Sequence, residues 1–137
     1  MKKKYYITLI TLIINLTGAY AQLDNIHYLP PLKQAGNNQA IQYQQVYFST
    51  PETNSFSVSI YKGTATTAIQ VITGLSKGNP KTYNPGNGDN NITLVTNSNT
   101  GIVLSNSGLR FESSGGEKFY VNYRGRSSAQ AASLTCK

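Results

Sequence analysis

The sequence is poor in the side chains that most often build catalytic and metal sites. Among its 137 residues it has one histidine, His27, one cysteine, Cys136, and no tryptophan. A metal site made of several imidazoles is therefore excluded, and an internal disulfide cannot form. A Ser-His-Asp arrangement would need His27 as its base, and no nucleophile-elbow motif is present. We interpret His27 as a structural or surface histidine and Cys136 as a small apolar strand residue.

Acidic residues are also few, with five Asp and Glu against twelve Lys and Arg. Glu112 and Glu117 flank the Gly115-Gly116 turn and could form the carboxylate pair of a glycoside hydrolase, but charges at hairpin edges are commonly solvated. The glycine-rich loop 85–91 offers one carboxylate, Asp89, which is too few for a calcium loop. A phosphate loop would need a following helix, so a hairpin loop is expected here. The sequence thus predicts a protein that is not an enzyme and holds no cofactor or metal.

The first 21 residues have the three-part layout of a secretory signal. Three lysines precede an apolar run over residues 5–16, and Ala19 and Ala21 occupy the −3 and −1 positions of a cleavage site. The run is shorter than the roughly 20 apolar residues that span a bilayer as a helix. We expect residues 1–21 to form a signal helix that engages the export machinery and is removed after Ala21. The sequence predicts a secreted or cell-surface protein without a stable membrane anchor.

The positive charge is modest once the signal is removed. Three of the twelve basic residues belong to the signal, which leaves nine against five acidic residues, a net charge of +4. These residues are spread along the chain, whereas nucleic-acid-binding proteins cluster them on one element. We expect no nucleic-acid partner.

The mature part divides into two segments. Residues 22–45 form an extended entry segment rich in Pro, Gln and Asn, where Pro30 and Pro31 exclude a helix interior. Residues 46–137 alternate short runs of Val, Ile, Thr, Tyr and Phe with clusters of Gly, Asn, Ser and Pro, which is typical of strands and turns. This length is sufficient for one domain.

The clearest strand covers residues 55–61, where Phe56, Val58 and Ile60 alternate with serines. Other strands are expected over 46–49, 68–73, 91–96, 101–104, 109–112, 119–123 and 131–135. With about eight strands, the predicted fold is all-β, an antiparallel β-sandwich that follows the signal helix. We expect the inward faces to contain Phe48, Phe56, Val58, Ile60, Ile69, Val71, Ile92, Leu94, Val103, Leu109, Phe111, Phe119 and Val121.

Several segments carry a resemblance to a known family. They are Gly108-Leu109-Arg110-Phe111-Glu112-Ser113-Ser114, the stretch 119–135, and, near the start, His27-Tyr28-Leu29-Pro30-Pro31-Leu32 and Tyr47-Phe48-Ser49-Thr50-Pro51. The chain resembles, over residues 26–137, the N-terminal domain family named for IgG-Fc-binding protein. It is most similar to the version that opens large surface proteins of gliding Bacteroidota.

The resemblance implies a non-enzymatic extracellular β module, often exported by the type IX system in proteins with a C-terminal sorting domain. In the family the strand at 131–135 runs on into a further segment, whereas here the chain stops at Lys137. We therefore expect a truncated chain in which Cys136 lies at an exposed end. The resemblance assigns no ligand-contacting residue.

The favoured function is a cell-surface interaction module, the N-terminal part of an adhesin-like protein that binds an unknown extracellular protein or glycan. The alternative is a carbohydrate-binding module or accessory domain of a secreted glycan-processing protein, with tyrosines as stacking platforms. Tyr43 and Tyr61 are further candidates for exposed aromatic residues. The candidate interaction surface consists of Tyr120, Tyr123, Arg124 and Arg126.

Overall fold

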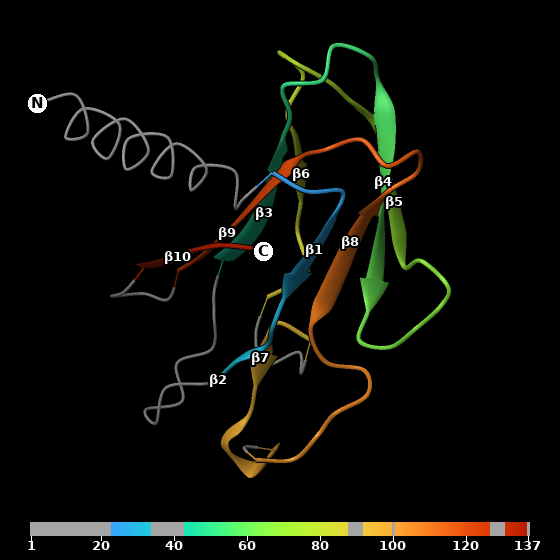
Figure 1. Cartoon of the computed structure of the whole chain (residues 1–137). Helices are drawn as coiled ribbons and strands as arrows, with labels where there is room; N and C mark the ends of the chain where they lie inside the picture. The colour runs from blue at the N-terminus through green and yellow to red at the C-terminus, as the bar shows by residue number, and fades with distance from the viewer. Residues whose placement is uncertain (1–22, 34–42, 88–91, 100, 127–130, 137) are drawn as a thin grey trace, which may run out of the picture.

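The computed structural model describes residues 23–33, 43–87, 92–99, 101–126 and 131–136. These form two four-stranded antiparallel sheets that face each other (Figure 1). The first sheet contains, in spatial order, β1 (Ile26–Leu29), β8 (Leu109–Ser113), β4 (Phe56–Lys62) and β5 (Gln70–Leu75). The second contains β10 (Ala131–Thr135), β9 (Tyr120–Arg126), β3 (Tyr43–Ser49) and β6 (Lys81–Tyr83). The predicted all-β sandwich is confirmed.

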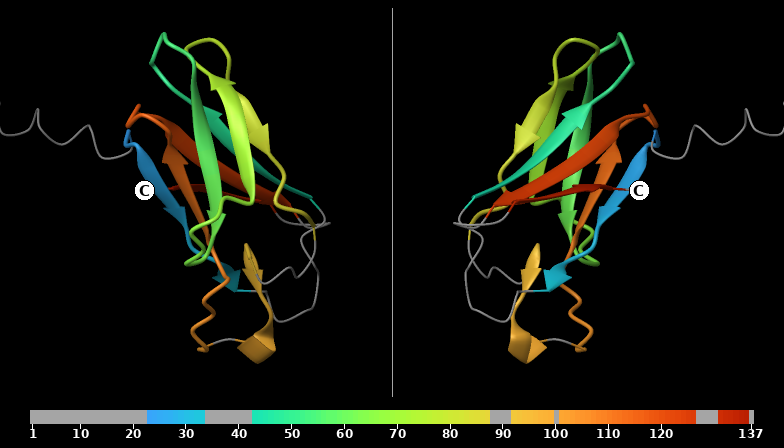
Figure 2. Two further views of the ribbon diagram at one scale, coloured as in Figure 1. Left: turned by 90° about the vertical axis from the view of Figure 1, so that its right-hand side faces the viewer. Right: turned by 90° about the vertical axis from the view of Figure 1, so that its left-hand side faces the viewer.

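A short parallel pair lies beyond one end of the two sheets (Figure 2). It joins β2 (Leu32–Lys33) to β7 (Leu94–Val95), and a single 3₁₀ turn, Asn97–Asn99, follows it. Within the described ranges no helix is long and apolar enough to cross a membrane. Segment 1–21, where a signal helix is predicted, lies outside the described residues.

Strand β4 shows how the sequence pattern produces the core. Phe56, Val58 and Ile60 are all buried, and the residues between them lie on the outer face, as predicted. Strand β4 pairs with β5 on one side and with β8 on the other, so both neighbouring strands shield its inner residues from solvent. The buried apolar cluster consists of Leu29, Val46, Phe48, Phe56, Val58, Ile60, Leu75, Leu109, Phe111, Phe119, Val121, Tyr123 and Cys136.

Phenylalanines from both sheets meet at the centre of the core. Phe48 of β3 packs edge-on against Phe111 of β8, with ring centroids 5.3 Å apart. The ring centroid of Phe119 lies 6.3 Å from that of Phe48 and 6.3 Å from that of Phe56. Aromatic pairs of this kind contribute about 0.5–1.5 kcal/mol beyond the area that they bury, so this cluster holds the two sheets together.

Three predicted core residues are on the surface instead. Ile69 and Val71 are 45% and 48% exposed, and Val103 is 98% exposed. The pairing of β4 with β5 shifts by one residue, because two residues of β5, Thr73 and Gly74, lie opposite one of β4. As a result Val58 pairs with Ile72, and Val71 pairs with the outward-facing Ser59. The inner face of β5 is therefore formed by Ile72 and Leu75.

The segment 101–104 does not form a strand. It has an apolar composition but no hydrogen-bonded neighbour in either sheet, and it belongs to the loop between the 3₁₀ turn and β8. An isolated apolar run cannot become a strand without a free sheet edge to pair with. Strands β6 and β7, which precede and follow loop 85–91 in the sequence, belong to different sheets and therefore do not form the expected hairpin.

The sandwich takes in part of the entry segment 22–45. Strand β1 pairs with β8 along its whole length, and the first three residues of β3 pair with β9. The polar residues of this segment contribute to the core through His27 and Gln44, which are both fully buried. The stretch 34–42 lies outside the described residues.

Candidate interaction surface

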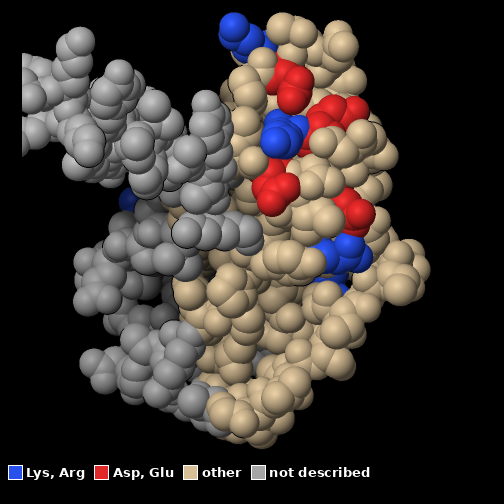
Figure 3. All heavy atoms as spheres, viewed as in Figure 1, with Lys and Arg blue, Asp and Glu red and all other residues tan. Residues whose placement is uncertain are grey.

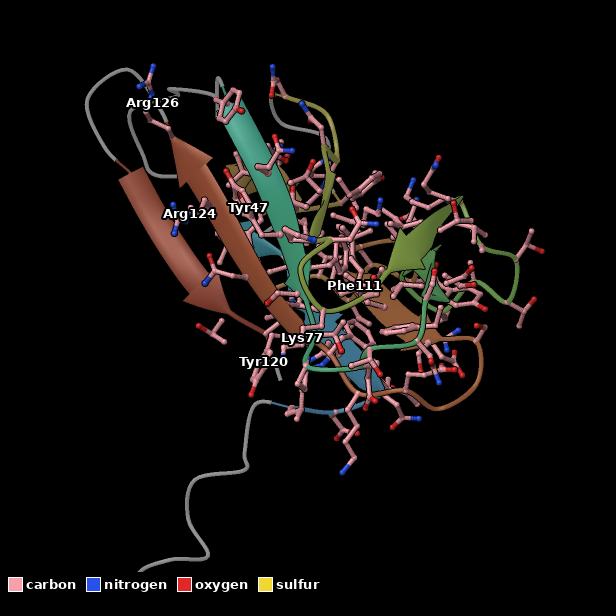
Figure 4. All side chains as sticks on the ribbon, turned by 90° about the horizontal axis from the view of Figure 1, so that it is seen from above. Tyr47, Lys77, Phe111, Tyr120, Arg124 and Arg126 are labelled. Carbon is pink, nitrogen blue, oxygen red and sulfur yellow. The ribbon has the colours of Figure 1, made fainter. Side chains whose placement is uncertain are left out.

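Strand β9 presents three of the four residues predicted as an interaction surface. Its residues alternate, so Tyr120, Arg124 and Arg126 are exposed on the outer face of the second sheet. Seen from above, Arg124 and Arg126 lie on the side of β9 away from Phe111, which sits between the sheets (Figure 4). The outer face of β9 is thus a row of aromatic and cationic side chains.

Tyr123, the fourth predicted residue, is part of the core and not of this surface. It is fully buried, because it lies two residues after Val121 and therefore points to the same, inner side of the strand. Its hydroxyl donates to Gln44 Oε1 at 3.0 Å, and Thr93 Oγ1 donates to the same oxygen at 2.6 Å. Burial raises the pKa of Tyr123 above 10.0. The hydrogen bonds to Gln44 satisfy a phenol group that would otherwise be costly to bury.

Strand β3 contributes the other half of the surface. Tyr43 and Tyr47 are 53% and 37% exposed, and Tyr120 of β9 is 39% exposed. In the antiparallel register Tyr43 lies opposite Arg126, so the tyrosines of β3 stand beside the arginines of β9. Tyr43 is among the exposed aromatic residues predicted from the sequence and Tyr47 is not, although the odd-numbered residues of this strand alternate with the buried Val46 and Phe48.

Arg124 is held in place by its neighbours. Its guanidinium carbon lies 5.2 Å from the centroid of the Tyr47 ring, within the range of a cation–π contact. Its Nε donates to Asn122 Oδ1 at 3.4 Å, and Asn122 Nδ2 donates to Thr135 Oγ1 of β10 at 3.5 Å. These contacts connect the outer faces of β3, β9 and β10.

The charge on this face is of one sign. None of the four described acidic residues lies in the strands of the second sheet; they are Asp24, Glu52, Glu112 and Glu117. The one ion pair among the described residues joins Arg110 and Glu112 on the first sheet. Figure 3 shows acidic side chains beside basic ones over the upper part of the described surface in that view. Among the described residues, neither Arg124 nor Arg126 forms an ion pair with an acidic side chain.

His27 is buried in a structural position. Its Nε2 lies 2.7 Å from the carbonyl oxygen of Phe119 and 3.1 Å from that of Asp24. Its Nδ1 lies 3.2 Å from the carbonyl oxygen of Cys136. Both ring nitrogens therefore contact backbone oxygens, and the ring connects β1 with the start of β9 and the segment after β10.

The two glutamates considered as a catalytic pair have separate local contacts. Glu112 pairs with Arg110 of the same strand, and Glu117 Oε2 accepts a hydrogen bond from the Gly115 amide at 2.9 Å. Of the loop 85–91, only residues 85–87 are described, and Asp89 lies outside them. No group of three His, Cys, Asp or Glu suited to a metal ion occurs in the described ranges.

The first sheet carries a second surface feature. Tyr28, Arg110 and Tyr61 lie side by side across three strands, with the Arg110 guanidinium carbon 4.0 Å from the centroid of the Tyr61 ring. A hollow of about 270 Å³ opens next to this row. Its lining has one charged residue, Arg110, which is already paired with Glu112. In this row Glu112 neutralises the positive charge of Arg110, whereas the arginines on the outer face of the second sheet form no ion pair with a described residue.

No protein-family model, curated protein or solved structure matches the chain. The fold and the surface define its class: an all-β sandwich with one sheet face that is aromatic and cationic. Function has to be inferred from that face.

Proposed function

We propose that this chain is a non-enzymatic extracellular or cell-surface interaction module, the N-terminal part of an adhesin-like protein. Its contact surface is the outer face of the second sheet, formed by Tyr43, Tyr47, Tyr120, Arg124 and Arg126. The observation that carries this proposal is the grouping, on two neighbouring strands, of three exposed tyrosines and two arginines that form no ion pair with a described residue.

The residue types on this face favour contact with a partner. Tyrosine and arginine are enriched at protein interfaces, because each covers a large apolar area and also forms hydrogen bonds. Central strands β3 and β9 are paired on both sides, so their outer residues are held on a rigid support. A rigid support lowers the entropy lost when a partner binds.

The cellular setting remains part of the proposal. The signal layout of residues 1–21 supports export, and the resemblance to the IgG-Fc-binding protein N-terminal domain supports a place on the surface of gliding Bacteroidota, reached through type IX secretion.

The contact face can be tested by adhesion. Beads coated with the chain would be applied under flow to surfaces coated with immunoglobulin G, fibrinogen, an acidic polysaccharide or neutral dextran. We expect retention on at least one coat above the level on bare surface. The double substitution Tyr47→Ser and Tyr120→Ser should reduce that retention severalfold, because it removes two aromatic contacts.

A matched control comes from the opposite sheet. Tyr28→Ser and Val71→Ser remove exposed apolar side chains of similar accessibility from β1 and β5, and retention should stay near the wild-type level. If the control pair reduced retention as much as Tyr47→Ser with Tyr120→Ser, the contact surface would not be the one proposed.

A carbohydrate-binding module is the second candidate function. It is favoured by the same exposed tyrosine rings, since sugar rings pack their C–H faces against aromatic side chains. In the adhesion assay this candidate predicts retention on polysaccharide coats, whereas a protein-binding module would be retained on the protein coats.

A further inference from the structure

The outer face of the second sheet carries a short cationic row. Arg124 and Arg126 are both exposed and form no ion pair with a described residue. Alternate residues of a strand point to the same side about 7 Å apart, so the two guanidinium groups follow one another along β9. A partner with repeated negative charges would compensate this row.

The guanidinium group of Arg124 is already positioned in the free protein. Arg124 lies over the Tyr47 ring and donates to Asn122 Oδ1. A planar guanidinium pairs with both oxygens of a carboxylate at once, so its orientation matters for binding. Restricting that orientation in the free protein reduces the entropy lost on binding.

Flat rings and amide groups flank the arginines. The register places Tyr43 opposite Arg126 and Gln45 opposite Arg124, and the Tyr43 hydroxyl donates to Gln45 Oε1 at 3.3 Å. Tyrosine rings offer an apolar face for a sugar ring, and amides can both donate to and accept from sugar hydroxyls. An acidic peptide would use the arginines but has no such need for the rings.

We infer that this face binds an acidic polysaccharide, a chain of sugar rings that carries carboxylate groups and lies along β9 and β3. The inference rests on the proposed contact face, which both candidate functions share, and narrows the partner to one chemical class. The arginines bind the carboxylates, and the tyrosines and amides bind the rings and hydroxyls.

The probe is sodium polygalacturonate, with its methyl-esterified form as the uncharged counterpart. Biolayer interferometry with the full chain should show binding to the first polymer and at least about tenfold weaker binding to the second, as expected for loss of charge-assisted hydrogen bonds. Substituting Arg124→Gln and Arg126→Gln together should weaken binding by a similar factor. Binding should also weaken as salt is raised, because exposed charges are screened.

The control removes the same charge elsewhere. Lys77 and Lys118 are exposed and lie outside the four strands of the second sheet, and Lys77→Gln with Lys118→Gln should change affinity less than about twofold. Equal losses for the two double variants would mean that net charge alone drives binding and would overturn the inference.

Two further outcomes would also overturn it. One is binding of poly-glutamate as tight as that of polygalacturonate, with no effect of Tyr47→Ser and Tyr120→Ser, since that would identify an acidic peptide as the ligand. The other is absence of polygalacturonate binding while bead retention on a protein coat still depends on Tyr47 and Tyr120. That second result would leave the proposed function standing.

Discussion

At the scale of single residues, His27 shows how a polar side chain can stabilise an otherwise apolar core. It is fully buried, its ring meets Phe119 edge-on at 4.7 Å, and its nitrogens reach three carbonyl oxygens. The carbonyl of Asp24 is three residues from His27 in the sequence, whereas those of Phe119 and Cys136 are 92 and 109 residues away. His27 therefore contributes to closing the sandwich at both ends of the chain.

Replacing His27 should be strongly destabilising. The substitution His27→Leu replaces the imidazole with an apolar side chain of comparable size and removes its hydrogen bonds to the carbonyl oxygens, although Asp24 and Phe119 keep the hydrogen bonds between their own backbones. Loss of a hydrogen bond to a buried group costs about 1–3 kcal/mol. Urea unfolding followed by circular dichroism should show a loss of at least about 2 kcal/mol. The neighbouring Tyr28→Phe, on the exposed side of β1, serves as control and should stay within about 0.5 kcal/mol. If His27→Leu lowered the free energy of unfolding as little as Tyr28→Phe, His27 would not have the structural role assigned to it.

Cys136 is buried, which contradicts the expectation of an exposed chain end. Its burial agrees with the interpretation as a small apolar residue, although it lies just after β10 and not within a strand. Its side chain is 3% exposed, and its amide donates to Val121 O at 3.0 Å. Burial raises the pKa of the thiol from 9.0 to about 11. The protonated thiol is the form that this apolar site accommodates.

Two measurements on Cys136 follow from its burial. A thiol-specific reagent should react slowly with the native chain at neutral pH and quickly in urea, because only the unfolded chain exposes the thiol. Because the pKa is higher in the folded state, the stability contribution is complete below pH 9 and declines as the pH rises toward about 11. Tyr83 and Tyr123, whose pKa values burial also raises, titrate in the same direction.

The variant Cys136→Ala separates the thiol from the tyrosines. Its melting temperature should fall less steeply over that alkaline range than the wild type. A native thiol that reacts as fast as the unfolded one, or identical alkaline slopes for the two proteins, would contradict the buried position.

At the scale of strands, β4 gives the sharpest test of which face is inside. Ile60→Ala removes a fully buried side chain and should cost roughly 2–5 kcal/mol of unfolding free energy. Ser59→Ala, one residue earlier on the outer face, should stay within about 0.5 kcal/mol. Chemical denaturation of both variants checks this, and comparable losses would mean that the assigned face is wrong.

Strands were predictable where strict alternation and a neighbouring strand coincide. The strands around Val58, Phe111 and Val121 follow this rule, and their inner residues are buried as predicted. Strands β1 and β6 were missed because they are only four and three residues long. They form through pairing with β8 and β3, which are distant in the sequence. Val103 shows the opposite error, an apolar residue in a run that pairs with nothing.

The candidate surface was predicted in part for the same reason. Tyr120, Arg124 and Arg126 were identified on β9, and the alternation of that strand would also have placed Tyr123 inside. The contribution of Tyr47 could not be derived from β9 alone, because it requires knowing that β3 pairs with β9 in the observed register. The residue types of a strand and their alternation can be derived from its own sequence, whereas the set of residues on a sheet face also depends on which strands pair and in what register.

At the scale of the whole molecule, the proposed export implies a defined mature N-terminus. Cleavage after Ala21 should leave Gln22 as the first residue, and mass spectrometry of secreted material would show it. Recovery of an exported chain that still begins with Met1 would contradict the signal assignment.

The central claim is that the outer face of β3 and β9 is where this module meets its partner. The most direct measurement is a titration of the isotope-labelled chain with oligogalacturonate, followed by amide chemical shifts in NMR. We expect the largest shifts on the segments Tyr43–Ser49 and Tyr120–Arg126, with β4 and β5 little changed. Shifts concentrated on Phe56–Lys62 and Gln70–Leu75 would contradict the central claim, whereas no shifts anywhere would overturn the assignment of an acidic polysaccharide as the partner.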